Sequence, residues 1–136
     1  MKAFLDTPLL VYLNTLTDEK VRERYENFYL DLLPQYKLYT DVLVLDELLY
    51  VSKKKYKVPY NITIEFIDTI VLPYVTVLSL GEEEYSAARE ILMRHNLKPS
   101  DALHAAVAMN NGIKVVVTED SEFDRVEGLE RLWLEP

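Results

Sequence analysis

Two aspartates each follow a predicted strand closely enough to lie at its carboxyl end. Asp6 ends the apolar run KAFL (Lys2–Leu5), and Asp120 comes two residues after the run KVVVT (114–118). Because parallel strands end at the same edge of a sheet, we expect both carboxylates on one rim. Ligands of open α/β sheets bind beyond this rim, so the two acids are candidates for chemistry.

Two further candidate acids lie on predicted helices. Asp101 stands in the first turn of a helix that starts at Pro99, where free backbone N–H groups help to keep a carboxylate ionised. Glu47 lies in the middle of a helix, with apolar neighbours three and four residues away, and Asp46 has a similar surround. Burying an unpaired carboxylate is costly, so at least one of this pair needs a partner. No arginine is obviously placed to provide it, and a bound cation would serve.

Four carboxylates gathered in this way suit Mg²⁺ or Mn²⁺, which are hard ions that prefer oxygen ligands. One or two such ions can activate a water molecule and stabilise the charge that builds up in phosphodiester cleavage. Each acid alone has a plainer interpretation: a helix-start acid for Asp101, a turn residue for Asp6, and a half-buried acid reaching water for Glu47. Their joint placement favours the metal site.

The elements that position these acids alternate between strand and helix. Strands are predicted at 2–5, 37–40, 75–78, 114–118 and 131–134. Helices are predicted from about 7 to 14, from a cap at Thr17 to near Pro34, after a cap at Asp41, over 61–72, from 82 to about 94, and from 99 to a C-terminal cap at Gly112. The β-branched residues of 61–72 also suit a strand, but their apolar spacing favours a helix. The pattern predicts an α/β fold, a single domain over 1–136 with a mostly parallel sheet of four or five strands and helices on both faces.

Composition excludes several classes of protein. The chain has no cysteine, which rules out disulfides and cysteine metal sites, and its three glycines are too far apart for a phosphate-binding loop. Acids outnumber bases by 23 to 15, so the net charge of −8 argues against a broad basic face for nucleic acid. One or two bound divalent ions would bring this charge to about −6 or −4. With no targeting or membrane-spanning segment visible, a cytoplasmic location is the default expectation.

Four segments, in this order, carry a family resemblance. They are FLDTPLLVYL, LVLDELLYV, PSDALHAAVA and VVVTEDSEFDRVEGLERL, and together they extend over nearly the whole chain. The chain resembles the PIN domains, in particular the stand-alone VapC-type toxins of prokaryotic toxin–antitoxin pairs. The last two segments are the most specific part of the resemblance.

The resemblance implies a Mg²⁺- or Mn²⁺-dependent endoribonuclease. Its catalytic and metal-binding acids would be Asp6, Glu47, Asp101 and Asp120. Glu47 rather than Asp46 matches the helix acid of the family. Pro8 stands where many members have asparagine.

Other polar residues near the fourth acid have possible roles. By resemblance, the Thr118 hydroxyl would orient the acids from the end of its strand. Glu122 and Asp124 add carboxylates close to Asp120, and either could take its place.

Three residues are predicted to contact an RNA substrate: His104, Lys53 and Arg94. His104 lies one helical turn after Asp101, although a histidine in an alanine-rich helix is commonly just packed. Four lysines between 53 and 57 could attract phosphates or could simply stabilise the end of a helix. Tyr12 and Tyr50, close in sequence to the proposed acids, could stack on bases.

The resemblance also implies protein partners, a second copy of the chain in a homodimer and a cognate antitoxin. The apolar, tyrosine-rich segments 14–33 and 60–74 are candidate surfaces for them. A non-catalytic PIN-like scaffold that binds RNA or a protein is the alternative. Phosphatases of the haloacid-dehalogenase type need a second aspartate where Pro8 stands, and receiver domains need paired acids and a strand-end lysine that are missing here.

Overall fold

The centre of the molecule is a five-stranded parallel sheet, seen in a computed structural model that describes residues 1–135. The strand order is β3-β2-β1-β4-β5, and every pair of neighbours is parallel. The strands are β1 (Lys2–Leu5), β2 (Lys37–Asp41), β3 (Val75–Leu78), β4 (Val115–Val117) and β5 (Glu130–Leu132). The central strands β1 and β4 are almost entirely buried, as expected for a parallel sheet covered on both faces.

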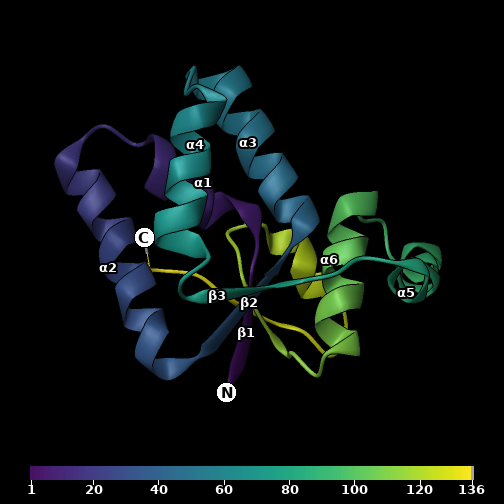
Figure 1. Cartoon of the computed structure of the whole chain (residues 1–136). Helices are drawn as coiled ribbons and strands as arrows, with labels where there is room; N and C mark the ends of the chain where they lie inside the picture. The colour runs from purple at the N-terminus through teal and green to yellow at the C-terminus, as the bar shows by residue number, and fades with distance from the viewer. Residues whose placement is uncertain (136) are drawn as a thin grey trace.

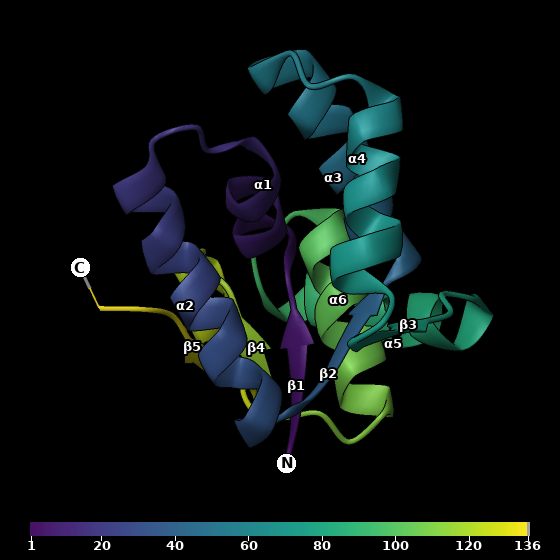
Figure 2. The same cartoon turned by 60° about the vertical axis from the view of Figure 1, so that its left-hand side comes forward.

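Within residues 1–135, six α-helices surround this sheet. They are α1 (Thr7–Thr15), α2 (Glu19–Gln35), α3 (Val42–Tyr56), α4 (Tyr60–Phe66), α5 (Glu82–Arg94) and α6 (Pro99–Asn110). Helix α2 lies on one side of the sheet, while α5 and α6 lie on the other (Figures 1 and 2). Helices α1, α3 and α4 extend beyond the carboxyl ends of the strands (Figure 2). The predicted α/β class with helices on both faces is therefore confirmed.

The strand order creates a switch point between β1 and β4. The chain passes from β1 to β2 and β3 in one direction, and then places β4 and β5 on the other side of β1. Connections therefore leave the neighbouring strands β1 and β4 toward opposite sides, and this is where open α/β sheets bind ligands. The register pairs Leu5 with Val117, so the residues that follow these strands lie side by side.

The predicted elements match the structure with small differences at their ends. The cap of α2 is Asp18 rather than Thr17, because the Asp18 side chain accepts hydrogen bonds from the backbone N–H groups of Lys20 and Val21. This helix also passes Pro34 and ends at Gln35.

The structure also agrees with the predicted helix over 61–72 and with the glycine predicted to end α6. The segment 61–72 is helical as predicted, with its second half (Ile67–Val71) forming a π-helical turn. Gly112 adopts a φ of 70° just after α6, a left-handed conformation that glycine takes without strain. Within residues 1–135, no helix is long and apolar enough to cross a membrane.

Candidate metal centre

Asp6 is held at the end of β1 by contacts with β4. Its backbone N–H donates to the Val117 carbonyl at 3.1 Å, and the hydroxyl of Thr118 donates to Asp6 Oδ2 at 2.8 Å. The same hydroxyl oxygen accepts a hydrogen bond from the Asp120 N–H at 3.1 Å. Thr118, itself fully buried, therefore connects the two strand-end aspartates that the sequence placed on one rim.

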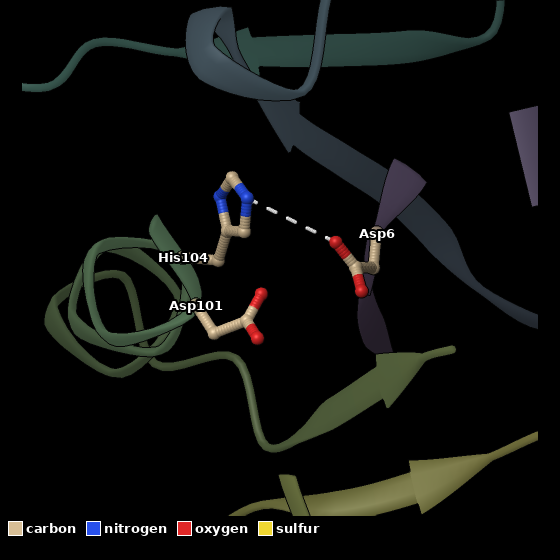
Figure 3. A group of neighbouring side chains, drawn as sticks. All are labelled: Asp6, Asp101 and His104. Atoms are coloured by element: carbon tan, nitrogen blue, oxygen red, sulfur yellow. Dashed lines mark ion pairs between the residues drawn. The ribbon is translucent and has the colours of Figure 1, made fainter. Parts of the chain in front are cut away.

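Asp101 reaches the same centre from the first turn of α6. The residue is 6% exposed, and its Oδ2 has no hydrogen-bond partner among residues 1–135. Burial, and then the negative charges of Asp6 and Asp120, raise the pKa of Asp101 to about 7. Figure 3 shows Asp101 and His104 leaving α6 together and pointing toward Asp6. An unpartnered buried carboxylate that faces other carboxylates is a group that a cation would stabilise.

Among the residues that the structure describes, potential metal-ligand atoms gather in two overlapping groups around Asp101. Asp6, Asp101 and His104 form one group, and Asp101, Asp120 and Glu122 form the other, each with its ligand atoms within 4.8 Å of one another. Asp124 is engaged elsewhere, because its Oδ1 accepts a hydrogen bond from the Arg131 side chain at 3.0 Å. The buried acidic cluster that these two groups form, without Asp124, can therefore hold a metal ion.

His104 lies beside Asp6 in this cluster and has no exposed surface. Its Nδ1 is 2.6 Å from Asp41 Oδ2 and its Nε2 is 2.8 Å from Glu47 Oε1, while Asp6 Oδ1 lies 3.9 Å from Nε2. Burial opposes the charged form, but the hydrogen bonds to Asp41 and Glu47 outweigh it and raise the pKa of His104 to about 10. At neutral pH His104 is therefore an imidazolium that donates from both nitrogens to carboxylates.

The helix acid that turns inward is Glu47. Its side chain is 31% exposed and contacts His104, whereas Asp46 is exposed to solvent. Glu47 was expected to need a partner because its helical neighbours are apolar. That partner is the imidazolium of His104 on α6. The sequence carries a signal for it, since His104 stands three residues after Asp101 on the same helical face.

Asp41 belongs to the centre but was predicted only as a helix cap. It does cap α3, because its Oδ1 accepts from the Val44 N–H at 2.8 Å. Its other oxygen contacts His104, and the residue has no exposed surface. The available signal was its place at the end of β2, the same relation that singled out Asp6 after β1.

The remaining candidates belong to neither group of ligand atoms. Lys53 is near the end of α3, with its Nζ 4.1 Å from the centre of the Tyr60 ring. Arg94 ends α5 and lines a separate hollow between α5 and α6. Tyr12 donates a hydrogen bond from its hydroxyl to Glu119, the residue before Asp120.

A parallel sheet with a buried acid cluster at its switch point is the architecture of a known class of proteins. The chain belongs to the PIN domain family, whose model matches residues 3–129. The resemblance in the sequence is thereby confirmed for the family. Among curated protein sequences, the search found no match to this chain.

Solved structures with a similar fold include VapC proteins and their complexes. VapC20 from Mycobacterium tuberculosis, described as a sarcin–ricin loop cleaving toxin, is 19% identical over 90% of this chain and 93% of its own, with a TM-score of 0.74. VapBC2 from Rickettsia felis, bound to a DNA fragment from its promoter, gives 24% identity, 98% coverage of each chain and a TM-score of 0.72. VapBC-1 from nontypeable Haemophilus influenzae gives 22% identity, 97% coverage of each chain and a TM-score of 0.68.

Proposed function

We propose that the protein is a Mg²⁺- or Mn²⁺-dependent endoribonuclease, the toxin of a type II toxin–antitoxin pair. One observation carries the proposal. The buried carboxylate of Asp101 has an unpartnered oxygen beside Asp6 and Asp120, at the point of the sheet where ligands bind. The family and the VapC-like fold support a nuclease that acts on RNA.

The donor set fits a hard divalent cation. His104 is protonated and donates from both nitrogens, so it has no lone pair to offer a metal. The ligands are then the carboxylates of Asp6, Asp101 and Asp120, with Glu47 and Glu122 beside them. A site made of oxygen ligands favours Mg²⁺ or Mn²⁺ over zinc. When bound, such an ion supplies a Lewis acid and lowers the pKa of a coordinated water.

The surrounding residues orient the carboxylates for hydrolysis. The Thr118 hydroxyl donates to Asp6 Oδ2, and the other oxygen, Oδ1, lies 3.9 Å from His104 Nε2. His104 holds the carboxylate of Glu47 through a hydrogen bond of 2.8 Å from Nε2 to Oε1. In the reaction, a water molecule loses a proton and its oxygen forms a bond to the phosphorus of an RNA linkage. The bond from phosphorus to one ribose oxygen breaks, and that oxygen takes up a proton. Oriented carboxylates place the attacking water, and such positioning accounts for much of the rate.

The partner proposal rests on a partly apolar hollow between two segments that the sequence singled out. It lies between α2 and the α4 region, lined by Tyr29, Leu30, Leu33, Phe66, Ile70 and Tyr74. Leu30 and Tyr74 are each more than half exposed. Exposed apolar patches of this kind mark protein-binding sites. Because the neighbours VapBC2 and VapBC-1 are toxin–antitoxin complexes, we propose that a cognate antitoxin covers this hollow and that the chain forms a homodimer.

The test is cleavage of single-stranded RNA by the purified protein with Mn²⁺. We expect Asp6→Asn and Asp101→Asn to lower the rate by more than about 100-fold, because even residues behind metal ligands typically matter by 10- to 100-fold. Asp124→Asn is the matched control, since this nearby aspartate pairs with Arg131. Equal rates for the wild type and both site variants would assign any cleavage to another source and leave the non-catalytic scaffold as the better account.

A further inference from the structure

One face of α3 leads from the acid cluster toward the lysine-rich end of the helix. Glu47, Tyr50 and Lys54 stand at positions i, i+3 and i+7, so they share this face. At 1.5 Å per residue, Lys54 lies about 10 Å beyond Glu47 along the helix axis. Helix α3 runs outward from the carboxyl ends of the strands, so the face continues away from the cluster (Figures 1 and 2).

Tyr50 and Lys54 are joined on this face. Lys54 Nζ donates to the Tyr50 hydroxyl at 2.9 Å, and it lies 5.4 Å from the centre of the Tyr50 ring. Tyr50 is 53% exposed, although most large aromatic rings pack against other groups. The pair therefore presents an aromatic ring and an ammonium group to solvent next to Glu47.

The end of α3 and the start of α4 repeat this combination. Lys53 lies 4.1 Å from the centre of the Tyr60 ring, and Lys55 lies 5.5 Å from that of Tyr56. Both tyrosines are exposed, at 45% and 37%. Residues 48–64 contain four lysines and no acid, a formal charge of +4 within a chain of net charge −8.

Stabilisation of the helix end explains only part of this surface. Lysines favour the negative end of a helix dipole, and Lys57 fits that role because its Nζ donates to the Lys54 carbonyl at 3.2 Å. Lys54 instead extends back along the helix to Tyr50, toward the acid cluster. The dipole also gives no reason for three exposed tyrosines.

We propose that this surface is a track for single-stranded RNA, with Tyr50 and Lys54 as its subsite nearest the acids. A ring with exposed surface can stack on a base only where that base is unpaired, and lysines bind the phosphates between bases. The track consists of Tyr50, Lys53, Lys54, Lys55, Tyr56, Lys57 and Tyr60. It deepens the proposed nuclease function, because it gives the RNA strand a direction of approach along α3.

The experiment measures RNA binding without cleavage. Fluorescence anisotropy of the full chain in EDTA at low salt compares a labelled 12-nucleotide RNA with an abasic oligomer that has the same number of phosphates. Tyr50→Ala is expected to weaken RNA binding about 10-fold, within the range for loss of one stacking contact, and to leave abasic binding unchanged. Lys54→Ala is expected to weaken both and to lower the slope of log K against log salt by about 0.7.

Matched variants separate stacking and charge from general effects. Tyr50→Phe retains the ring and should bind RNA nearly as the wild type does. Tyr85→Ala removes a tyrosine of similar exposure from α5, and Lys20→Ala removes an exposed lysine from α2; neither should change RNA binding. Far-ultraviolet circular dichroism checks that each variant is folded.

The outcomes test the proposed RNA track separately from the proposed nuclease function. Equal RNA affinity for the wild type and Tyr50→Ala, or no binding by the wild type at low salt, overturns the track even if the metal-loaded chain cleaves RNA. A third outcome would assign the lysines to an acidic protein partner. In that case polyglutamate would displace the labelled RNA as strongly as unlabelled RNA does, and Tyr50→Ala would not change RNA affinity. This outcome also overturns the proposed track. Weakened binding of Tyr50→Ala with no cleavage by the metal-loaded wild type would support the track and contradict the nuclease.

Discussion

His104 and Asp41 form a buried pair, with 2.6 Å between Nδ1 and Oδ2 and no exposed surface on either residue. The other oxygen of Asp41 caps α3, and the other nitrogen of His104 contacts Glu47. The pair therefore joins the end of β2, the start of α3 and the acid centre. It also places one positive charge beside several carboxylates, which lowers the cost of keeping them close in the metal-free protein.

Replacing Asp41 with asparagine tests this pair. Asparagine is also a good helix cap, so the change removes chiefly the charged contact with His104. Breaking a buried ion pair on one side typically costs about 3–5 kcal/mol, and we expect a loss of about 3 kcal/mol in the free energy of unfolding by urea. Asp18→Asn, which alters the exposed cap of α2, is the control and should cost less than about 1 kcal/mol. Similar losses for the two variants would contradict a special role of the pair.

The stability of the metal-free protein should fall as the pH rises. The folded-state pKa is raised to about 7 for Asp101 and to about 10 for His104, each above its value in the unfolded chain. A group whose pKa is raised by folding binds more protons in the folded state, so its contribution is full at low pH and is lost as the pH rises. The contribution of Asp101 to stability is lost between about pH 4 and 7, and that of His104 between about pH 6.5 and 10. Urea unfolding in EDTA at several pH values measures this.

A variant and a metal titration test whether Asp101 causes the pH dependence at the lower end. Asp101→Asn should reduce the loss of stability in the lower window, where burial also raises the pKa of Asp6, and should leave a loss in the upper window. Mn²⁺ competes with the proton on Asp101, so metal affinity measured by calorimetry should rise up to about pH 7 and then level off. A metal-free protein that becomes more stable between pH 5 and 7 would show that the carboxyl of Asp101 is not held in its protonated form.

Thr118→Val tests the hydroxyl between the strand-end acids. Valine has the same shape but loses the donor to Asp6 Oδ2 and the acceptor for the Asp120 N–H. We expect RNA cleavage to fall about 10- to 100-fold, as for other residues that orient metal ligands. Thr118→Ser should recover most of the rate because it restores the hydroxyl.

Thr40→Val is the matched control for that variant. The Thr40 hydroxyl is also fully buried and donates to the Leu5 carbonyl at 2.9 Å, but within residues 1–135 it has no hydrogen bond to a carboxylate. Both valine variants should lose a similar stability, about 1 kcal/mol or somewhat more, and only Thr118→Val should lose cleavage. Equal losses of activity would mean that the hydroxyl of Thr118 acts only through stability.

The acids after β4 should divide into one that affects metal binding and one that does not. Glu122 can place an oxygen within 4.8 Å of the ligand atoms of Asp101 and Asp120, whereas Asp124 pairs with Arg131. Calorimetry with Mn²⁺ should show weaker binding for Glu122→Gln, by about 10-fold, and unchanged binding for Asp124→Asn. The reverse order would indicate that the 3₁₀-helix Ser121–Arg125 rearranges around the metal.

Much of the fold could be predicted because its signals are local. The short apolar strands Lys2–Leu5 and Val75–Leu78 appear with the predicted bounds, and the helix start at Pro99 was equally clear. Ends fixed by one hydrogen bond were less certain. Thr17 and Asp18 are both good caps, and only the backbone path decides which side chain reaches the free N–H groups of α2.

The sequence by itself determined that Asp6 and Asp120 share a rim, because strand ends in a parallel sheet must coincide. It also determined that Glu47 or Asp46 needs a partner, because an apolar helix buries one of them. Only the tertiary structure decided that the partner is His104 and that Asp41 shares it. Those contacts span 57 and 63 positions of the sequence and depend on how α3 and α6 pack across the end of the sheet. Packing of this kind is set by the whole core at once, whereas strand ends and helical faces follow from the spacing of nearby residues.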